Sequence, residues 1–372
     1  MAGRIVLLGA TGYTGELTAR ELAGRGERPV LAGRDADRVR ALADGLGGLD
    51  WAVADVGGPQ GTAAVRALLE AGDVLVSTVG PFTRLGAPAV EAAIDAGAHY
   101  LDSTGEAPFI RRVFASWGPR AAAAGSVLLT AMGYDWVPGN LAGALALREA
   151  GEGAVQVQIG YFTTGGAMGP SAMSGGTRAS AAGVLLGPSF AFRGGRLVGE
   201  RGGARARSFG VKGKARRAIS AGSTEHFALP RSYPGLRDVD VFLGWFGGAS
   251  DAVRAVSAAT ALLTRVPGVR EVLGTALGRV VTGSSGGPGP EARALSGSYV
   301  VAEARDAGHR LLATAVLEGV NGYDFTAGML AWGAHAVAAG RARGAGALGP
   351  VEAFGLDALS VGVQAAGLRR IA

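Results

Sequence analysis

A glycine-rich turn near the amino terminus holds the residues of this chain best suited to binding a ligand. The stretch Gly9–Gly15 (GATGYTG) follows the apolar run Ile5–Leu8 and opens a helical pattern of apolar residues. Such a strand–turn–helix unit directs free backbone N–H groups at one point, which suits a diphosphate; an ordinary tight turn is the alternative. Gly12 lets the backbone approach the ligand closely, and Gly15 lets the helix pack tightly on the strand. We expect cofactor contacts from Gly9, Thr11, Gly12, Tyr13, Thr14 and Gly15.

The end of the next apolar run indicates which dinucleotide would fit. Residues 29–33 are typical of a second buried strand, which is followed by Arg34 and Asp35. An NAD-selective fold carries an acidic side chain at the strand end, where Gly33 stands here. The Arg34 guanidinium matches a 2′-phosphate through two parallel charge-assisted bonds, so we predict NADP(H) as the cofactor. The alternative is a surface arginine beside a helix that Asp35 caps.

Later strand ends supply further candidate contacts with this cofactor. Residues 50–55, 73–78, 99–102 and 126–130 are predicted strands of the same sheet. The carboxyl ends of parallel strands share one edge, so turns there lie near a bound dinucleotide. The alternative for the polar residues is that they satisfy backbone groups of their own turns. The expected contacts are Asp55, Thr78, Val79, Gly80, Pro81, Asp102 and Thr104.

Three residues are candidates for acid–base chemistry. Tyr134 and Asp135 follow the sixth strand, where a tyrosine could donate a proton and a carboxylate could orient it. The alternative is that both are turn residues. His226 stands beside Glu225 in a polar stretch and is the third candidate, whereas the other three histidines are expected to be structural or solvated. No spacing of these residue types predicts a metal site.

The residue inventory excludes several reductase mechanisms. The chain has no cysteine, which excludes disulfides, thiolate zinc sites and cysteine nucleophiles. No tyrosine has a lysine four residues later, as short-chain reductases require, and the only lysines are Lys212 and Lys214. What remains is hydride transfer from the cofactor to a C=N bond or to an activated C=C bond, and the sequence leaves both open. A dinucleotide-binding sensor or partner subunit with little catalysis is the alternative function.

Hydrophobic patterning predicts an α/β fold of two parts. Alternating strands and helices over residues 5–130 predict a Rossmann doubly wound parallel sheet. Period-two alternation over 154–161, 237–242, 298–304 and 310–318 then predicts an antiparallel sheet, covered by helices over 177–186 and 251–264. We expect a Rossmann dinucleotide-binding domain over 1–135, a mixed α+β substrate or dimerisation domain over 136–322, and C-terminal helices over 323–372 that return to the Rossmann domain.

The distribution of charged residues indicates which classes of binding partner to expect. The net charge is +6, and much of the excess lies in an arginine- and glycine-rich stretch over 193–217. This stretch lacks the interleaved aromatics of single-strand nucleic-acid surfaces, so we expect no nucleic-acid partner. A solvated loop or hairpin is the simpler interpretation, and docking of an acidic substrate carrier is the alternative. There is no apolar run of about 18 residues and no signal-peptide pattern, so we expect a cytoplasmic protein without a membrane span.

Four stretches resemble the saccharopine dehydrogenase-like reductases, in particular the bacterial branch that includes trans-acting enoyl reductases. They are the glycine turn with 32–34, residues 78–82, residues 100–106 and residues 133–138, with weaker likeness over 174–177 and after Asp324. The resemblance implies an NADP(H)-binding Rossmann domain, a second domain that often supports a homodimer, and a small-molecule or carrier-bound substrate. The family often has Phe and Ser where Tyr134 and Trp136 stand, so the substrate does not carry over.

Overall fold

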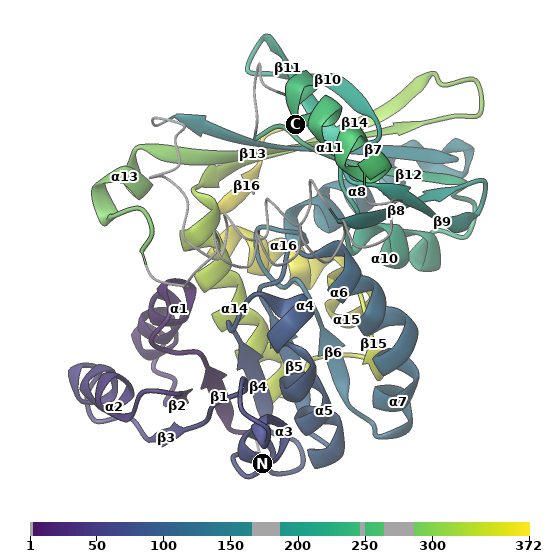
Figure 1. The fold of residues 1–372 in the computed structure, drawn as a ribbon. Helices are drawn as coiled ribbons and strands as arrows, with labels where there is room; N and C mark the ends of the chain where they lie inside the picture. Colours follow the sequence, from purple (N-terminus) through teal and green to yellow (C-terminus); the bar gives the residue numbers. More distant parts are fainter. Residues whose placement is uncertain (1–2, 166–186, 246–249, 264–285) are drawn as a thin grey trace. The chain divides into compact units, whose positions relative to one another are not determined.

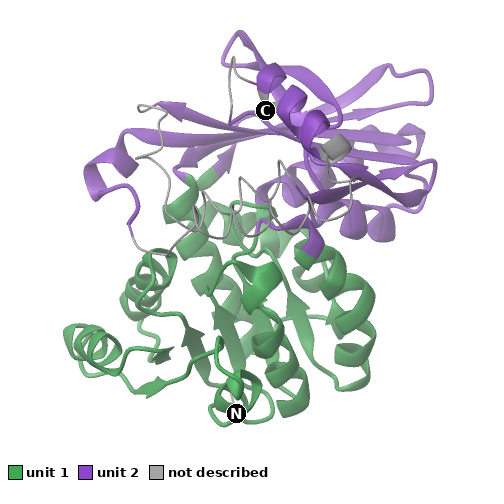
Figure 2. Ribbon diagram, viewed as in Figure 1, with its two compact units in different colours: residues 1–104, 109–137, 322–368 green, residues 105–108, 138–321, 369–372 purple. Residues whose placement is uncertain are grey.

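The computed structural model describes residues 3–165, 187–245, 250–263 and 286–372. The helix expected over 177–186 and the family-like stretch 174–177 lie outside these ranges. The chain divides into two compact units, which we describe separately (Figure 2). Unit 1 comprises residues 1–104, 109–137 and 322–368, and unit 2 comprises residues 105–108, 138–321 and 369–372.

Unit 1 contains a parallel seven-stranded sheet, which confirms the predicted Rossmann doubly wound fold. The strand order is β15-β6-β5-β4-β1-β2-β3, and each pairing is parallel (Figure 1). The order reverses between β1 and β4, and dinucleotides bind at such a switch point. The strands are β1 (Ile5–Leu8), β2 (Val30–Gly33), β3 (Trp51–Val53), β4 (Val74–Ser77), β5 (His99–Asp102), β6 (Val127–Leu129) and β15 (Gly346–Ala347).

Helices connect these strands. Residues 107–123 form three consecutive helical segments, the middle one a π-helical turn over Val113–Trp117. The last long helix, α14, packs against α1 and against strands β1, β4 and β5 of unit 1. The helices are α1 (Tyr13–Gly24), α2 (Ala36–Gly45), α3 (Gly61–Arg66), α4 (Phe82–Leu85), α5 (Ala87–Ala96), α6 (Ala107–Arg112), α7 (Gly118–Ala123), α14 (Gly322–Ala338), α15 (Pro350–Phe354) and α16 (Leu356–Ala365).

Unit 2 is built on a mixed sheet rather than the purely antiparallel sheet that we expected. Strand β12 lies parallel to β7, because a long connection over residues 166–237 replaces a hairpin between them. The order is β10-β11-β12-β7-β13-β14-β16, with β8 pairing β12 and β9. The strands are β7 (Gln156–Gly165), β8 (Pro188–Arg193), β9 (Arg196–Arg201), β10 (Ala206–Val211), β11 (Lys214–Ser220), β12 (Asp238–Leu243), β13 (Ser296–Arg305), β14 (Leu311–Val320) and β16 (Leu368–Arg370).

Helices of unit 2 pack on this sheet. The helix α10 contacts β8 and β12, and α11 contacts β9 and β11. A hairpin turn over 305–309 joins β13 and β14, with the Asp306 N–H donating to the Arg310 carbonyl at 3.1 Å. The helices are α8 (Val137–Ala150), α10 (Glu225–Ser232), α11 (Ser250–Leu263) and α13 (Pro290–Ala294), with a short 3₁₀ turn over Gly151–Gly153.

The basic stretch 193–217 forms two β-hairpins, β8–β9 and β10–β11. Several of its arginines pair with acids inside the sheet: Arg193 with Asp240 at 2.5 Å, and Arg205 with Glu200 at 2.9 Å. Their charge is therefore engaged within unit 2, which favours the hairpin interpretation over a free docking patch. In the ranges that the structure describes, no helix combines the length and the hydropathy needed to cross a membrane.

Candidate functional site

The glycine turn after β1 has the geometry that a phosphate-binding turn requires. The N–H groups of Gly9 and Ala10 both donate to the Ala32 carbonyl of β2, at 2.8 and 3.1 Å, which anchors the turn on the sheet. Gly9 has a positive φ of 83°, which favours glycine. A Cβ at Gly15 would lie 2.1 Å from the Gly9 carbonyl oxygen, so only glycine lets α1 pack this closely on the turn.

The start of α1 leaves donors available for an anion. Gly12 is the N-cap residue and has no side chain that could accept from the first turn of the helix. The first N–H groups of a helix have no intrahelical acceptor, and the positive end of the helix dipole adds to their attraction for phosphate. Tyr13 and Thr14 open this helix at the carboxyl end of β1, next to the switch point of the sheet. The observed geometry therefore fits the diphosphate of a dinucleotide.

The turn after β4 packs directly on the glycine turn. The Thr78 hydroxyl lies 3.2 and 3.1 Å from the carbonyl oxygens of Leu8 and Gly9, to which it donates. The Val79 side chain lies so close to Gly9 that a Cβ there would stand 2.7 Å from its Cγ2. Residues Gly80 and Pro81 follow, joined by a cis peptide bond, and lead into α4. The structure thus brings the predicted residues of the two turns together.

The end of β2 carries a glycine where an NAD-selective site carries an acidic side chain. A Cβ at Gly33 would lie 3.0 Å from Val39 Cγ2, a tight contact with α2 that favours glycine there. Arg34 is exposed and forms no hydrogen bond or ion pair with any residue that the structure describes. Asp35 caps α2 by accepting from the Arg38 N–H at 3.1 Å, as expected. Arg34 is therefore free to meet a 2′-phosphate.

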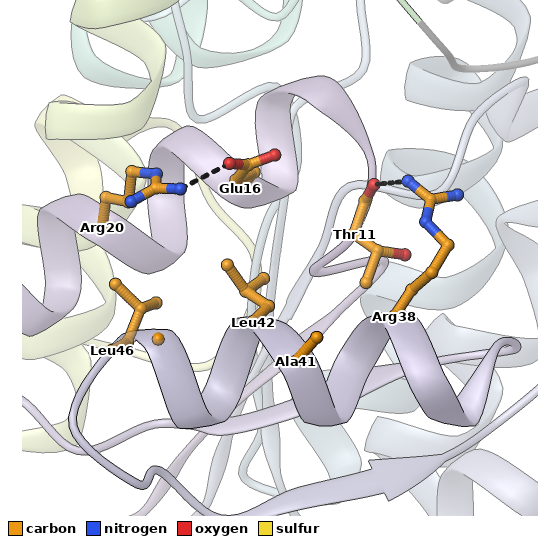
Figure 3. Close-up of a pocket in the computed structure, with 8 residues that line it drawn as sticks. Thr11, Glu16, Arg20, Arg38, Ala41, Leu42 and Leu46 are labelled. Atoms are coloured by element: carbon orange, nitrogen blue, oxygen red, sulfur yellow. Dashed lines mark hydrogen bonds and ion pairs between the residues drawn. The ribbon is translucent and has the colours of Figure 1, made fainter.

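Sequence reasoning overlooked Arg38. Its guanidinium Nη2 donates to the Thr11 carbonyl oxygen of the glycine turn at 2.9 Å. Its position one helical turn after Arg34 was the signal that could have identified it. Figure 3 shows Arg38 and Thr11 at one end of a groove between α1 and α2, of about 450 Å³, where Glu16 also pairs with Arg20. Of the predicted cofactor residues, only Thr11 lines this groove. The groove therefore lies beside the expected diphosphate site and does not coincide with it.

Two predicted carboxylates at the sheet edge differ in exposure. Asp55 is exposed and accepts from the Gly57 N–H at 2.9 Å, which closes its own turn. Asp102 is fully buried and accepts from the N–H groups of Thr104 at 2.9 Å and Ala131 at 2.8 Å, and from the Thr130 hydroxyl at 2.8 Å. Burial raises the Asp102 pKa to about 6, although these hydrogen bonds oppose the rise. The role of each carboxylate, and of Thr104, as a cofactor contact stays a prediction.

The turn after β6 carries the first two acid–base candidates. The Tyr134 ring is buried and lies edge-on to Phe325, with 6.3 Å between ring centroids. Asp135 is partly exposed, and its buried Oδ1 has no hydrogen-bond partner among the described residues. Burial raises the Asp135 pKa to about 7, so near neutral pH the carboxyl group can hold or release a proton.

His226 belongs to unit 2, in a buried polar cluster at the start of α10. Its Nδ1 lies 3.2 Å from both the N–H nitrogen and the carbonyl oxygen of Ser223 and 3.0 Å from the Ser223 hydroxyl, so these contacts suit either tautomer. Burial lowers the His226 pKa to about 4, so the ring is neutral at pH 7, and its Nε2 has no partner in the described ranges. The Nε2 atom can therefore form a further hydrogen bond, and the ring carries no charge at pH 7.

Glu225, the neighbour of His226, is a buried ionisable group of unit 2 that sequence reasoning noted but did not place among the site residues. Its Oε1 accepts from the Tyr161 hydroxyl at 2.7 Å, and that hydroxyl accepts from the Gly139 N–H of α8 at 2.7 Å. Glu225 is fully buried, and burial raises its pKa to about 7. Its signal in the sequence was a glutamate at the first position of a helix, which is too common to identify a buried acid.

Comparisons with known proteins were made by sequence and by structure. Residues 5–129 match the family model of the saccharopine dehydrogenase NADP binding domain. Curated relatives include trans-acting enoyl reductases of Mycobacterium ulcerans, 42% identical over 143 residues, and Mycobacterium tuberculosis, 40% identical over 143 residues. Each alignment covers 37% of this chain and 34% of the relative, so the chain matches about a third of each relative's length.

Two solved structures resemble this chain along nearly its whole length. Saccharopine dehydrogenase (L-Glu forming) from Saccharomyces cerevisiae has a TM-score of 0.60 at 16% identity, covering 99% of both chains. Homospermidine synthase from Legionella pneumophila, solved with NAD, has a TM-score of 0.61 at 10% identity, covering 100% of this chain and 91% of that one. At these identities the likeness concerns the fold alone. With the glycine turn and the start of α1, the family match identifies residues 5–129 as a saccharopine dehydrogenase NADP-binding domain and confirms the predicted resemblance to the saccharopine dehydrogenase-like oxidoreductases.

Proposed function

We propose that this chain is an NADPH-dependent reductase that acts on an activated C=C or C=N bond of a small or carrier-bound substrate. The observation that carries the proposal is the uncapped start of α1 at the switch point of the sheet, with Arg34 unpaired beside a closed Gly33 position. A dinucleotide with a 2′-phosphate satisfies both features. The trans-acting enoyl reductases among the relatives favour a C=C bond as the group that is reduced. We also propose that the protein is a homodimer in the cytoplasm.

In this proposal, different residues of unit 1 bind different parts of the cofactor. The N–H groups of the first turn of α1 would bind the diphosphate, and Arg34 would bind the 2′-phosphate. Asp55 would lie near the adenosine. The turn Thr78–Pro81 would support the nicotinamide, because it packs against the glycine turn at the switch point. When bound, NADPH supplies the hydride.

The side chains after β6 would supply the proton. Reduction of an enoyl group places hydride on the β-carbon and a proton on the α-carbon, and that proton needs a donor. Asp135 is the preferred donor, since its pKa of about 7 keeps a large protonated fraction at neutral pH. Tyr134 is the alternative donor. His226 stays the third acid–base candidate and is neutral at this pH. For an iminium substrate, an ionised Asp135 would instead stabilise the positive charge.

The test is turnover with a panel of enoyl thioesters, enones and cyclic imines, followed by the loss of NADPH absorbance. We expect oxidation with at least one class, and a transferred deuterium on the β-carbon or on the imine carbon when 4-deuterated NADPH is used. Asp135→Asn should slow the enoyl reaction by about 10²-fold or more, within the range of general acid catalysis. Tight NADPH binding without turnover of any candidate would favour the alternative of a cofactor-binding sensor or partner subunit.

A further inference from the structure

The turn that carries Tyr134 and Asp135 is attached to unit 1 at several points. Its start is fixed by Asp102, whose carboxylate accepts from the Ala131 N–H at 2.8 Å and whose carbonyl accepts from the Met132 N–H at 2.7 Å. Ala131 has a positive φ of 60°, which few non-glycine residues adopt and which these bonds maintain. The turn closes on itself where the Trp136 N–H donates to the Ala131 carbonyl at 3.0 Å.

The middle of the turn is held from a helix that is distant in sequence. The Tyr134 N–H donates to the hydroxyl oxygen of Thr326 in α14 at 3.0 Å. That hydroxyl donates in turn to the Gly322 carbonyl, four residues earlier, at 2.7 Å. Because its single proton is committed to Gly322, the Thr326 oxygen faces Tyr134 as an acceptor. The direction of both hydrogen bonds is thus determined.

Close packing requires this arrangement. A Cβ at Gly133 would lie 2.7 Å from Thr326 Cγ2 and 2.9 Å from its Oγ1, so a larger residue would separate the turn from α14. A Cβ at Gly322 would lie 3.1 Å from the Tyr134 ring. Two glycines on the facing segments therefore let one threonine reach the backbone N–H of Tyr134, just before Asp135.

We propose that Thr326 is a positioning residue, which fixes the backbone of the Tyr134–Asp135 turn and thereby the place from which Asp135 gives its proton. The inference rests on the reductase function proposed above. Proton donation depends on a heavy-atom distance of about 2.6–3.2 Å, and an error of about 1 Å can cost 10²-fold in rate. Without its acceptor, the Tyr134 N–H would be buried unsatisfied and the turn would move to find another partner.

The first test measures the turn itself and needs neither substrate nor activity. The chain has 7 tyrosines, so ¹⁵N-tyrosine labelling gives a small set of amide signals, in which Tyr134→Phe assigns residue 134. We expect Thr326→Val to speed hydrogen exchange of the Tyr134 amide by about tenfold or more, and Thr326→Ser to restore protection, because serine keeps the hydroxyl. Unchanged protection in a folded Thr326→Val protein would overturn the proposal.

A matched control separates this bond from the general role of a helical threonine. Thr18 in α1 is buried and, like Thr326, donates to a carbonyl four residues earlier, at 2.8 Å. Thr18→Val should therefore remove the same bond within a helix as Thr326→Val, without changing exchange at Tyr134. Equal acceleration by both variants would mean that the amide reports only global loosening, and it would contradict the proposal.

The second test connects position with chemistry, using whichever substrate is reduced. Thr326→Val should lower kcat by about tenfold or more at unchanged NADPH Kd, and Thr326→Ser should recover most of the rate. The fall of kcat at alkaline pH, which the loss of the Asp135 proton produces, should shift or disappear. A fall in kcat that serine does not rescue would contradict positioning. If no substrate is reduced, the reductase function fails while the exchange result still decides whether Thr326 fixes the turn.

Discussion

The carboxyl groups of Asp102, Asp135 and Glu225 lie in surroundings that favour their protonated form. Burial raises the pKa of Asp102 to about 6 and those of Asp135 and Glu225 to about 7. A group whose pKa is higher in the folded state contributes stability that is complete below its unfolded pKa and is lost as the pH rises through its folded pKa. These acids therefore make folding less favourable toward pH 7, and such an arrangement is expected where a proton must be held.

Glu225 gives this effect its clearest test, because it is fully buried. Its pKa rises from 4.5 to about 7, which corresponds to about 3 kcal/mol at 1.36 kcal/mol per pH unit between the two values. Glu225→Gln should remove this loss. Between pH 4.5 and 7.5, the free energy of unfolding of the variant should therefore rise relative to that of the wild type. Urea unfolding at pH 5 and pH 8 measures the difference. Parallel pH dependence of the two proteins would contradict the buried acid, and the exposed Glu152→Gln is the control.

Arg34 is the residue that we expect to select NADPH over NADH. Arg34→Ala should weaken NADPH binding by about 1.5–3 kcal/mol, as expected for a hydrogen bond to a charged group, and should hardly change NADH binding. Calorimetry with both cofactors measures this. Arg40→Ala, which removes an exposed arginine within α2, should leave both affinities unchanged. Equal weakening of NADPH and NADH by Arg34→Ala would remove the assignment of the 2′-phosphate.

At the scale of elements, the packing of α1 on β1 determines whether the anion site exists. Gly15→Ala would put a methyl group 2.1 Å from the Gly9 carbonyl oxygen, a backbone atom that cannot move aside cheaply. We expect a loss of about 1–3 kcal/mol of stability and loss of NADPH binding. Gly24→Ala, at the end of the same helix with open space around it, should change stability by less than about 1 kcal/mol. Similar effects of both variants on thermal unfolding would refute the packing argument.

The elements also show what the sequence could predict. Strands β1, β2, β4 and β5 are short, buried and bounded by turns, so local pattern suffices for them. Strand β15 has two residues and β16 has three, too few for a periodic signal, and each forms only because a sheet edge accepts it. The parallel pairing of β12 with β7 was missed because alternation reports which face is buried and not strand direction.

In the candidate site, too, the features that depend on local sequence could be predicted, and those that depend on distant contacts could not. The glycine turn and the Asp35 cap follow from local chemistry and were predictable. Thr326 and Tyr161 were not, because each meets its partner across a large separation in sequence: 192 residues to Tyr134, and 64 to Glu225. Burial, which creates the unusual pKa values, is a property of the folded chain and leaves no mark on the residue types themselves.

At the scale of the whole molecule, the final four residues return to the sheet of unit 2. The Ile371 N–H donates to the Val316 carbonyl at 2.9 Å, the Val316 N–H donates to the Ala372 carbonyl at 2.9 Å, and Arg370 pairs with Glu149. Removal of residues 369–372 should cost about 1–3 kcal/mol of stability, mainly through the two backbone bonds, because the ion pair is half-exposed. Urea unfolding measures the loss. Unchanged stability would mean that this strand contributes nothing.

The central claim is that the Rossmann sheet of unit 1 holds a dinucleotide with a 2′-phosphate, from which the proposed reaction draws its hydride. Titration calorimetry of the intact chain with NADPH and NADH tests it most directly. We predict saturable binding of NADPH to one site per chain, about tenfold or more tighter than NADH, which is the factor that 1.4 kcal/mol provides. The absence of heat with either cofactor, or equal affinity for the two, would contradict the account.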